Sequence, residues 1–408
     1  MTDRCIIIGA SHAAAQLVPS LRQEGWQGEI VIVGDEPHLP YHRPPLSKAF
    51  LSGEKTAEEL PIRPAAFYDK NEATFYHGYV RAIDRVKKSV LLENGDVLSY
   101  DKLVLCTGAR VRKINVPGAE LGGVHYLRNI ADVEGIQAHI ATGKNAVIIG
   151  GGYIGLETAA SLTKQGMQVV VLEMAERILQ RVTPPEVSSF YARIHAEEGV
   201  EIKTNVQVTQ ITGEQTVQSV LCDDGQTFPA DVVIVGVGVI PNAELAEQAG
   251  LEVNNGIRVN AQCVTTDPNI FAAGDCTNHF NDMYDCQLRL ESVPNANEQA
   301  KVAAATLCGN PKTYNSLPWF WSDQYDLKLQ IAGLSRGFDH MVVRGDQDKG
   351  RSFAAFYYKE GRLIAADCVN RPKEFMLSKK MITQRSMLAP ELLCDESVTV
   401  KALIEQLR

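Results

Sequence analysis

One pattern occurs twice in this chain and constrains its fold more than any other feature. A short apolar strand, a small-residue turn, a helix and a second apolar strand ending in an acid follow one another in residues 5–35 and again in residues 146–173. In such a unit the N-terminus of the helix can bind a pyrophosphate, and the acid can bind ribose hydroxyls. Two copies predict two bound dinucleotides, and hence an enzyme that passes reducing equivalents between them.

The second copy matches the dinucleotide pattern at every glycine position. Gly150, Gly152 and Gly155 would provide a tight turn, a close approach to phosphate and close packing of the helix on the sheet. Glu173 ends the second strand, at the place of the ribose-binding acid. The strand before the turn and the helix after it favour a real nucleotide site over a fortuitous glycine turn.

The first copy is less regular. Gly9 keeps the first glycine position, but Ser11 and Ala14 replace the second and third glycines. Both residues are small enough for close approach, but two glycine positions of the pattern are lost. From the sequence alone, a nucleotide site is therefore no better supported here than a plain turn. Pro19 lies inside the expected helix, where it removes a hydrogen bond, and we expect a kinked helix.

Composition excludes several classes of protein. The chain has 408 residues, 45% of them hydrophobic and 22% charged, as in globular proteins of two or three domains. A net charge of −9 argues against general nucleic-acid binding. Membrane helices need about 18 consecutive apolar residues, which the sequence lacks, and the N-terminus does not resemble a signal peptide. We therefore expect a cytoplasmic protein without a membrane or nucleic-acid partner.

The cysteine spacing indicates how electrons leave the enzyme. The nearest two of the nine cysteines are Cys276 and Cys286, so the sequence has neither a C-x-x-C redox pair nor the spacing of a zinc site. Most of the cysteines are expected to be small core residues, and no metal site is expected. Disulfide reductases with two nucleotide folds use a neighbouring dithiol, which is missing here. Electrons must pass directly to an external acceptor.

The rest of the chain extends this α/β organisation. Prolines in residues 37–64 favour a rigid surface loop that leads into a helix. Short apolar runs closed by glycine predict further buried parallel strands; these are residues 99–108, 230–238 and 269–275. From about residue 317 the pattern changes to antiparallel strands, as in 319–321 and 352–358, followed by helices near 374–384 and 400–407. This indicates a third, α+β domain.

Several motifs resemble one family specifically. They are Arg43–Lys48, Gly150–Glu157, Gly274–Cys276, Glu291–Ala296, Pro318–Gln324 and Val369–Pro372. The chain resembles, over essentially its whole length, the FAD- and NADH-dependent ferredoxin reductases that serve bacterial cytochrome P450 and ring-hydroxylating dioxygenase systems. The resemblance implies a glutathione-reductase-like architecture: an FAD-binding domain in residues 1–112 and 240–316, an NAD-binding domain in 113–239, and a C-terminal α+β domain in 317–408.

The resemblance also implies an FAD site. Its residues would be Gly9, Ser11, Ala13, Asp35, Lys48, Val80, Arg128, Asp275 and Val293. Lys48 would lie beside the isoalloxazine ring, where a cation stabilises negative charge on the reduced flavin. From the residues alone, Arg128 would be a solvated charge and Val80 a core residue.

For NAD, the implied residues are Gly150, Gly152, Ile154, Gly155, Glu173 and Gly238. A carboxylate at Glu173 disfavours the extra phosphate of NADPH, although nearby Arg177 could accommodate it. By resemblance, Tyr153 covers the nicotinamide pocket, Glu157 pairs with Lys48, and Trp321 lies near the flavin. Without it, the first two would be ordinary helix residues and Trp321 a core tryptophan.

The implied mechanism has two stages. FAD accepts a hydride from NADH and then passes single electrons to a [2Fe-2S] ferredoxin, which supplies a cytochrome P450 or a dioxygenase. Such ferredoxins are acidic, so a basic patch is expected to steer docking. Candidates for this patch are Arg63, Lys301, Arg371, Lys379 and Lys380.

Two other functions remain open. An NADH oxidase or peroxidase of this fold needs a redox cysteine in residues 36–64, where the sequence has none. A flavoprotein like apoptosis-inducing factor, in which the redox state controls conformation, would turn over slowly with iron–sulfur partners. Both rank below a ferredoxin reductase.

Overall fold

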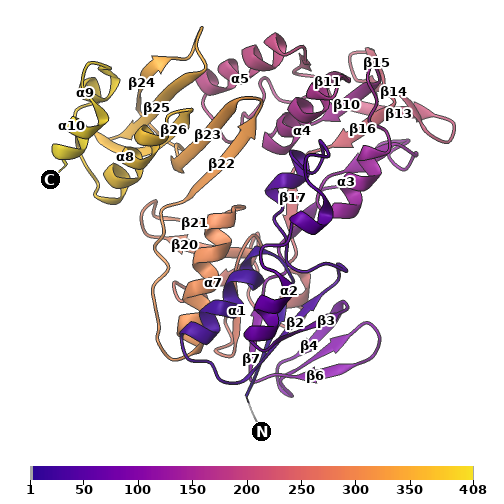
Figure 1. Ribbon diagram of the computed structural model, residues 1–408, viewed down its shortest axis with the longest axis vertical. Helices are drawn as coiled ribbons and strands as arrows, with labels where there is room; N and C mark the ends of the chain where they lie inside the picture. The colour runs from indigo at the N-terminus through magenta and orange to yellow at the C-terminus, as the bar shows by residue number, and fades with distance from the viewer. Residues whose placement is uncertain (1–2, 408) are drawn as a thin grey trace. The chain divides into compact units, whose positions relative to one another are not determined.

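The computed structural model describes residues 3–407 and divides the chain into two compact units (Figure 1). The first unit comprises the chain up to His42, Glu58–Arg110 and Val239–Pro318. The second comprises Arg43–Ala57, Val111–Gly238 and the chain from Trp319 onward. Within residues 3–407, no helix combines the length and apolar character that crossing a bilayer requires.

A five-stranded parallel sheet organises the first unit, with strand order β19-β7-β1-β2-β3. Its strands are β1 (Arg4–Ile8), β2 (Glu29–Gly34), β3 (Ala73–His77), β7 (Lys102–Leu105) and β19 (Ile270–Ala272). The helices of the unit are α1 (His12–Gln23), α2 (Ala65–Lys70), α6 (Glu244–Gln248) and α7 (Val293–Leu307). Smaller sheets are formed by β4 (Val80–Asp84), β5 (Ser89–Leu92) and β6 (Val97–Ser99), and by β18 (Ile257–Val259), β20 (Thr277–Asn281) and β21 (Cys286–Leu288).

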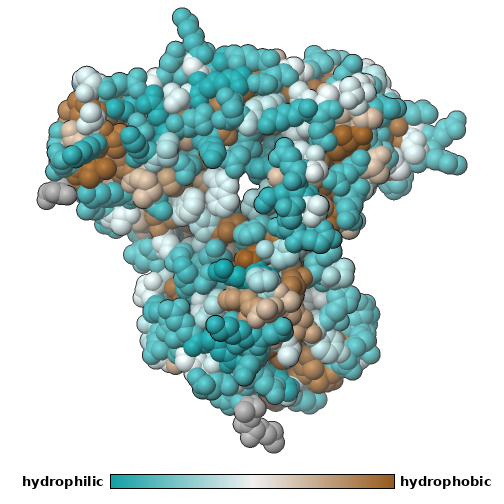
Figure 2. All heavy atoms as spheres, viewed as in Figure 1, coloured by the Kyte–Doolittle hydropathy of each residue, from teal (hydrophilic) through white to brown (hydrophobic). Residues whose placement is uncertain are grey.

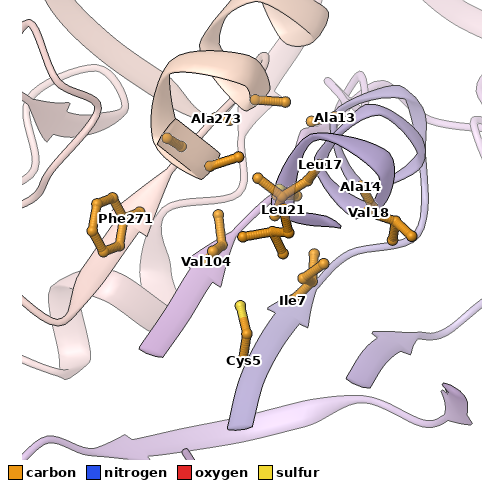
Figure 3. Packing of buried hydrophobic residues seen from close by; sticks show 14 of the residues in the cluster. Cys5, Ile7, Ala13, Ala14, Leu17, Val18, Leu21, Val104, Phe271 and Ala273 are labelled. Carbon is orange, nitrogen blue, oxygen red and sulfur yellow. The ribbon is translucent and has the colours of Figure 1, made fainter. Parts of the chain in front are cut away.

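Both faces of this sheet are buried, which explains why its strands are apolar at successive positions. Cys5 and Ile7 face one side, where Leu17 and Leu21 of α1 pack on them (Figure 3). Helix α7 lies beside α1 on the same face (Figure 1). Ile6, the intervening residue, packs on the other side with residues of β4 and β5. Pro19 lies inside α1, which nevertheless runs from His12 to Gln23.

The second unit contains another five-stranded sheet, with strand order β12-β11-β10-β16-β9 and all pairings parallel. The strands are β9 (Val124–Tyr126), β10 (Asn145–Ile149), β11 (Gln168–Leu172), β12 (Glu201–Lys203) and β16 (Val232–Val235). Its helices are α3 (Ile130–Gln137), α4 (Tyr153–Lys164) and α5 (Pro185–Glu197). An antiparallel sheet adjoins them, formed by β13 (Val208–Gly213), β14 (Val217–Cys222) and β15 (Thr227–Pro229). The strand–turn–helix motif therefore occurs twice, once in each compact unit.

The C-terminal residues form an antiparallel sheet with strand order β22-β23-β26-β25-β24. The strands are β22 (Trp319–Gln324), β23 (Leu327–Gly333), β24 (His340–Asp346), β25 (Ser352–Lys359) and β26 (Arg362–Val369). They are followed by α8 (Pro372–Thr383), α9 (Pro390–Cys394) and α10 (Val400–Glu405). The predicted α/β class, with two parallel sheets and an α+β C-terminal region, is confirmed.

The Pro-rich excursion is more than the expected surface loop. It contains the short 3-10 helices Pro44–Ser47 and Ala57–Glu59 and leads into α2, as predicted. Leu46, Phe50 and Leu51, however, are almost fully buried. Residues 43–57 also group with the second unit. The prolines indicated a rigid segment, but the buried apolar side chains between them fix it against the protein.

Candidate functional site

The first glycine turn joins β1 to α1 and has the backbone shape of a phosphate-binding turn. Gly9 has φ +107°, and a Cβ there would lie 2.1 Å from the carbonyl oxygen of Cys106. Only glycine fits this position. The small residues Ala13 and Ala14 are buried at the start of α1, so the helix packs closely on the sheet. The amides at this helix N-terminus can therefore approach a pyrophosphate, which fits the dinucleotide that the sequence implies.

Three more of the proposed FAD residues follow strands of the same sheet or begin α7, the helix beside α1. Asp35 follows β2 and is exposed. Asp275 follows β19, after Gly274, whose amide donates to the Gln299 side chain at 2.8 Å. Val293 begins α7. The carboxyl ends of parallel strands share one edge of a sheet, so Asp35 and Asp275 follow strands at the same edge as the glycine turn, where such folds bind dinucleotides.

Three of the proposed FAD residues have a different setting. Val80 begins β4 and is buried in the core with Ile6, so its side chain serves packing and only its backbone groups remain for a ligand. Lys48 and Arg128 belong to the second unit. There the Arg128 carbonyl accepts a hydrogen bond of 2.7 Å from the guanidinium of Arg43.

The second glycine turn joins β10 to α4. Gly150 has φ +111°, and a Cβ there would lie 2.5 Å from the Gly236 carbonyl oxygen. A Cβ on Gly155 would lie 2.2 Å from the Gly150 oxygen, which explains the glycine inside the helix. At Gly152 a Cβ would meet no atom of residues 3–407 within 4 Å, so space remains in front of the helix. These three positions fit the roles of turn, packing and phosphate approach.

The acid after β11 is tied to this turn. One Glu173 carboxylate oxygen accepts from the Gly151 amide at 2.7 Å, and the other accepts from the Ala175 amide at 2.8 Å. Arg177, the cation that left NADPH open, donates instead to the Thr183 carbonyl at 2.7 Å and to the Ser188 hydroxyl at 2.5 Å. Its guanidinium is therefore already engaged within the protein.

Two further proposed NAD residues flank the second turn. Ile154 is 42% exposed at the start of α4, unlike the buried residues that follow it in the helix. Gly238 has φ +98° and follows β16 in the same parallel sheet. A Cβ on Gly238 would lie 3.5 Å from an exposed guanidinium nitrogen of Arg181. Both positions offer open surface next to the glycine turn.

Lys48 and the buried Glu157 form a partly buried ion pair inside the second unit. The Lys48 ammonium lies 2.5 Å from the Glu157 carboxylate, and their side chains are 21% and 7% exposed. Ser47 donates to the same carboxylate oxygen at 2.6 Å, and Ser322 of β22 donates to the other oxygen at 2.7 Å. The structure thus brings together two residues that the sequence proposed through resemblance alone. Sequence reasoning missed both serines.

Aromatic side chains surround the start of α4 and β22. The Tyr153 ring contacts Phe320 edge-on, with centroids 5.0 Å apart. Its hydroxyl is buried and has no hydrogen-bond partner in residues 3–407, and burial raises the pKa of Tyr153 well above its usual value. Trp321 lies beside Trp319, with centroids 5.7 Å apart. These contacts give both residues a packing role in addition to any catalytic one.

A buried acid lies in the C-terminal sheet of the same unit. Asp367 is 2% exposed and accepts a hydrogen bond of 2.8 Å from the Tyr357 hydroxyl. Burial raises the pKa of Asp367 to about 7. Its charge is also among the causes that raise the pKa of Tyr153. This carboxyl therefore titrates near neutral pH, next to the aromatic residues around α4.

The proposed docking cations are divided between the two units. Arg63 and Lys301 belong to the first, and Lys301 forms an ion pair with Glu298 at 2.6 Å. Arg371 and Lys379 belong to the second, where Lys379 lies over the Trp319 ring, 4.8 Å from its centroid. Hydrophilic residues cover most of the face drawn in Figure 2. The proposed docking cations therefore do not form a single cluster within one unit.

Most of the cysteines are buried free thiols. All nine are free thiols, and six are buried: Cys5, Cys106, Cys222, Cys263, Cys276 and Cys368. Burial raises the pKa of the Cys106 thiol, which disfavours the reactive thiolate. Among the described residues, no three His, Cys, Asp or Glu side chains are grouped so that they could hold a metal ion.

Similarity to known proteins extends over nearly the whole chain. Putidaredoxin reductase CamA of Pseudomonas putida is 46% identical over 409 aligned positions, covering 98% of this chain and 97% of the relative. The anthranilate 1,2-dioxygenase system ferredoxin–NAD(+) reductase component of Burkholderia cepacia is 40% identical over 98% of this chain and 99% of its own length.

Solved structures agree with these relatives. The reductase in the covalent putidaredoxin reductase–putidaredoxin complex superposes with a TM-score of 0.96 at 45% identity, covering 99% of this chain and 98% of that one. The ferredoxin reductase for the CYP199A2 system of Rhodopseudomonas palustris gives a TM-score of 0.95 at 42% identity, covering 98% and 99%.

Family models account for the two parts of the sequence. Residues 319–404 match the family described as Reductase C-terminal. Residues 3–300 match the family described as pyridine nucleotide-disulphide oxidoreductase, whose members use FAD and a nicotinamide dinucleotide. With its two glycine turns in two parallel sheets, the chain belongs to the pyridine nucleotide-disulphide oxidoreductase family.

Proposed function

We propose that this protein is an NADH-dependent ferredoxin reductase, in which FAD takes electrons from NADH and passes them singly to a [2Fe-2S] ferredoxin of a cytochrome P450 or ring-hydroxylating dioxygenase system. The observation that carries the proposal is the pair of glycine turns, each at the carboxyl edge of its own parallel sheet. The relatives named for reductase activity toward putidaredoxin and ferredoxin support the choice of acceptor.

The proposal divides the chain by ligand. Residues 1–112 and 240–316 bind FAD, residues 113–239 bind NADH, and residues 317–408 complete the electron-transfer surface. In the first part, Gly9, Ser11 and Ala13 hold the FAD pyrophosphate, and Asp35 and Asp275 bind hydroxyls of the ribose and the ribityl chain. Val80 completes the adenine and phosphate surroundings together with Arg128, which lies outside these segments, in residues 113–239. Val293 borders the flavin pyrimidine.

In the nucleotide part, amides around Gly150, Gly152, Ile154 and Gly155 hold the NADH pyrophosphate at the start of α4. Glu173 selects NADH. Its carboxylate already accepts two backbone hydrogen bonds and would repel a 2′-phosphate, and Arg177 is held by Thr183 and Ser188.

The bound FAD and NADH supply the redox chemistry themselves. The protein positions them and shapes the local field. Lys48, held by Glu157, would place a positive charge beside bound FAD, where it would stabilise negative charge on the reduced ring. Tyr153 covers the nicotinamide pocket, Gly238 places no side chain beside the bound nucleotide, and Trp321 shapes the flavin edge. No side chain acts as a nucleophile, because the dithiol of disulfide reductases is missing from the sequence.

Ferredoxin-dependent reduction of cytochrome c tests the proposal. Purified protein containing FAD is supplied with NADH and cytochrome c, with and without a [2Fe-2S] ferredoxin. We expect turnover to require the ferredoxin and to fall as ionic strength rises, because charges steer docking. Turnover that does not depend on any of several such ferredoxins, or a polypeptide that does not bind FAD, would reject the proposal.

A further inference from the structure

The Ser-Asp-Gln end of β22 continues the Lys48–Glu157 pair into a longer hydrogen-bonded chain. Ser322 contacts Glu157 at 2.7 Å, and the Gln324 amide nitrogen lies 3.1 Å from the Ser322 hydroxyl. The Gln324 amide oxygen lies 2.8 Å from Nε2 of His195, and the Tyr325 hydroxyl lies 2.9 Å from Nδ1 of the same ring. This chain links β22 and its turn to helices α5 and α4.

Four members of this hydrogen-bonded chain are buried. His195 and Ser322 are 0% exposed, Gln324 is 1% exposed and Glu157 is 6% exposed. Buried polar groups must be satisfied within the protein, and hydrogen bonds in such surroundings polarise one another. These four buried polar residues, each hydrogen-bonded to the next, therefore need a consistent arrangement of donors and acceptors.

Chemistry allows one direction for the hydrogen bonds. A carboxylate only accepts, so Ser322 gives its single hydrogen to Glu157 and can only accept from Gln324. Gln324 must then present its amino group to Ser322 and its oxygen to His195. The oxygen only accepts, so the His195 ring carries its hydrogen on Nε2.

The far end of the chain agrees with this direction. Burial lowers the pKa of His195 to about 4, so the ring is neutral at physiological pH and its Nδ1 can accept from the Tyr325 hydroxyl. The Glu198 carboxylate acts on this ring in the opposite direction and raises its pKa, but burial has the larger effect. From Tyr325 through His195, Gln324 and Ser322, each donor points toward the Glu157 carboxylate.

We infer that Ser322, Gln324 and His195 are positioning residues for the Lys48–Glu157 pair: their aligned hydrogen bonds stabilise the Glu157 carboxylate through the oxygen that Lys48 does not contact, and so set the electrostatic potential that the pair presents. The inference rests on the proposed function, in which Lys48 lies beside the flavin. The chain does not conduct protons, because an amide between the serine and the histidine cannot pass a proton on as water or a hydroxyl does. Its effect is electrostatic.

Removing the central link tests the inference. In Ser322→Ala, Glu157 loses a donor and Gln324 loses the partner that fixes its amide, so the amide can turn over. Two changes follow: the His195 ring no longer keeps the single Nε2–H tautomer, and the electrostatic potential around the pair becomes more negative, because the Ser322 hydroxyl dipole no longer offsets the carboxylate charge. We expect the equilibrium constant for two-electron reduction of bound FAD to fall about tenfold, or about 30 mV.

The first readout is independent of turnover. Nitrogen NMR of the FAD-containing protein with labelled histidine reports the tautomer, and the signal is assigned by its loss in His195→Asn. Ser378→Ala is the matched control, since Ser378 is also a fully buried serine of this unit but donates to the Glu374 carbonyl outside the chain. It should change neither the tautomer nor the potential.

Gln324→Glu provides a second variant of nearly the same shape. It has no amino group to give to Ser322 and offers a carboxylate to the His195 ring. We expect the ring to become protonated near neutral pH and the flavin potential to fall. An unchanged tautomer and potential in Ser322→Ala, or in Gln324→Glu if the alanine variant does not fold, would overturn the inference. Equal changes in Ser378→Ala would also overturn it. These readouts need no ferredoxin, so they fail separately from the proposed activity.

Discussion

The Glu173 carboxylate accepts a 2.7 Å hydrogen bond from the Gly151 amide, which ties the acid at the end of β11 to the glycine turn at the end of β10. One side chain therefore holds the glycine turn and occupies the position where the sequence pattern predicts a ribose-binding acid. The neighbouring parallel strands make this possible, because Ile149 and Leu172 lie in register.

Glu173→Gln should weaken NADH binding and reduce the preference over NADPH. The amide keeps one acceptor oxygen but turns its amino group toward a backbone N–H, and the charge that repels a 2′-phosphate is lost. A hydrogen bond to a charged group contributes about 1.5–3 kcal/mol, so we expect the KM for NADH to rise at least about tenfold. KM and kcat measured with both nucleotides check this. An unchanged ratio of kcat/KM for NADH and NADPH would contradict the assigned role.

Gly150→Ala should disrupt the second turn far more than an alanine at an open glycine. A Cβ at Gly150 would lie 2.5 Å from a carbonyl oxygen, whereas at Gly199, with φ +90°, nothing in the described chain lies within 4 Å. Both variants carry the strain of a positive φ, on the order of 1 kcal/mol, and only the first adds a clash. Denaturant unfolding and NADH titration compare the pair. Equal losses in the two variants would show that the close contact is unimportant.

Lys48→Met should leave the Glu157 carboxylate buried without its cation. Breaking such a pair costs about 3 kcal/mol, while replacing both partners costs less. Lys48→Met combined with Glu157→Gln should therefore recover much of the stability but not the rate of flavin reduction. Unfolding and rapid-mixing measurements separate the two effects. Full recovery of the reduction rate in the double variant would show that the Lys48 charge has no catalytic role.

Asp367 should make the protein less stable as the pH rises toward neutrality. Its pKa is raised from 3.8 to about 7 by burial, so between these values the folded protein holds a proton that the unfolded chain releases. Its contribution is complete below pH 3.8 and is lost as the pH rises through about 7. Each pH unit of this window corresponds to about 1.4 kcal/mol.

The Asp367→Asn variant isolates this effect from other groups. His195 and His279, whose pKa values are lowered to about 4, add a stability change of opposite sign as the pH falls from 6.5 toward 4. The difference between variant and wild type removes them, and the variant should gain relative stability from pH 5 to pH 8. A difference that is constant over this range would contradict the raised pKa.

Much of the fold could be predicted from local sequence patterns. The glycine turns at Gly9 and Gly150 were predicted because positive φ and close approach leave a clear mark in sequence. The change to antiparallel strands after residue 317 was equally readable, because alternation and aromatic content differ from those of buried parallel strands.

Contacts between distant segments could not be predicted in this way. Ser322 is separated from Glu157 by 165 positions, and no local pattern indicates that they meet. The Lys48–Glu157 pair came from resemblance rather than from spacing. The prolines of the excursion predict a surface loop that leads into a helix, and the helix is present. The burial of Phe50 and Leu51 could not be predicted, because it depends on a surface contributed by the rest of the unit.

The central claim is that bound FAD is the only internal step between NADH and an iron–sulfur acceptor. Rapid mixing under nitrogen tests it most directly: the yellow protein is first mixed with NADH and then with an oxidised [2Fe-2S] ferredoxin. The account predicts bleaching of the flavin by NADH, followed by its reoxidation with two ferredoxins reduced for each FAD, unchanged when the exposed Cys286 and Cys394 are replaced by serine. Flavin that NADH does not bleach, or transfer to ferredoxin that is lost in the cysteine variants, would contradict it.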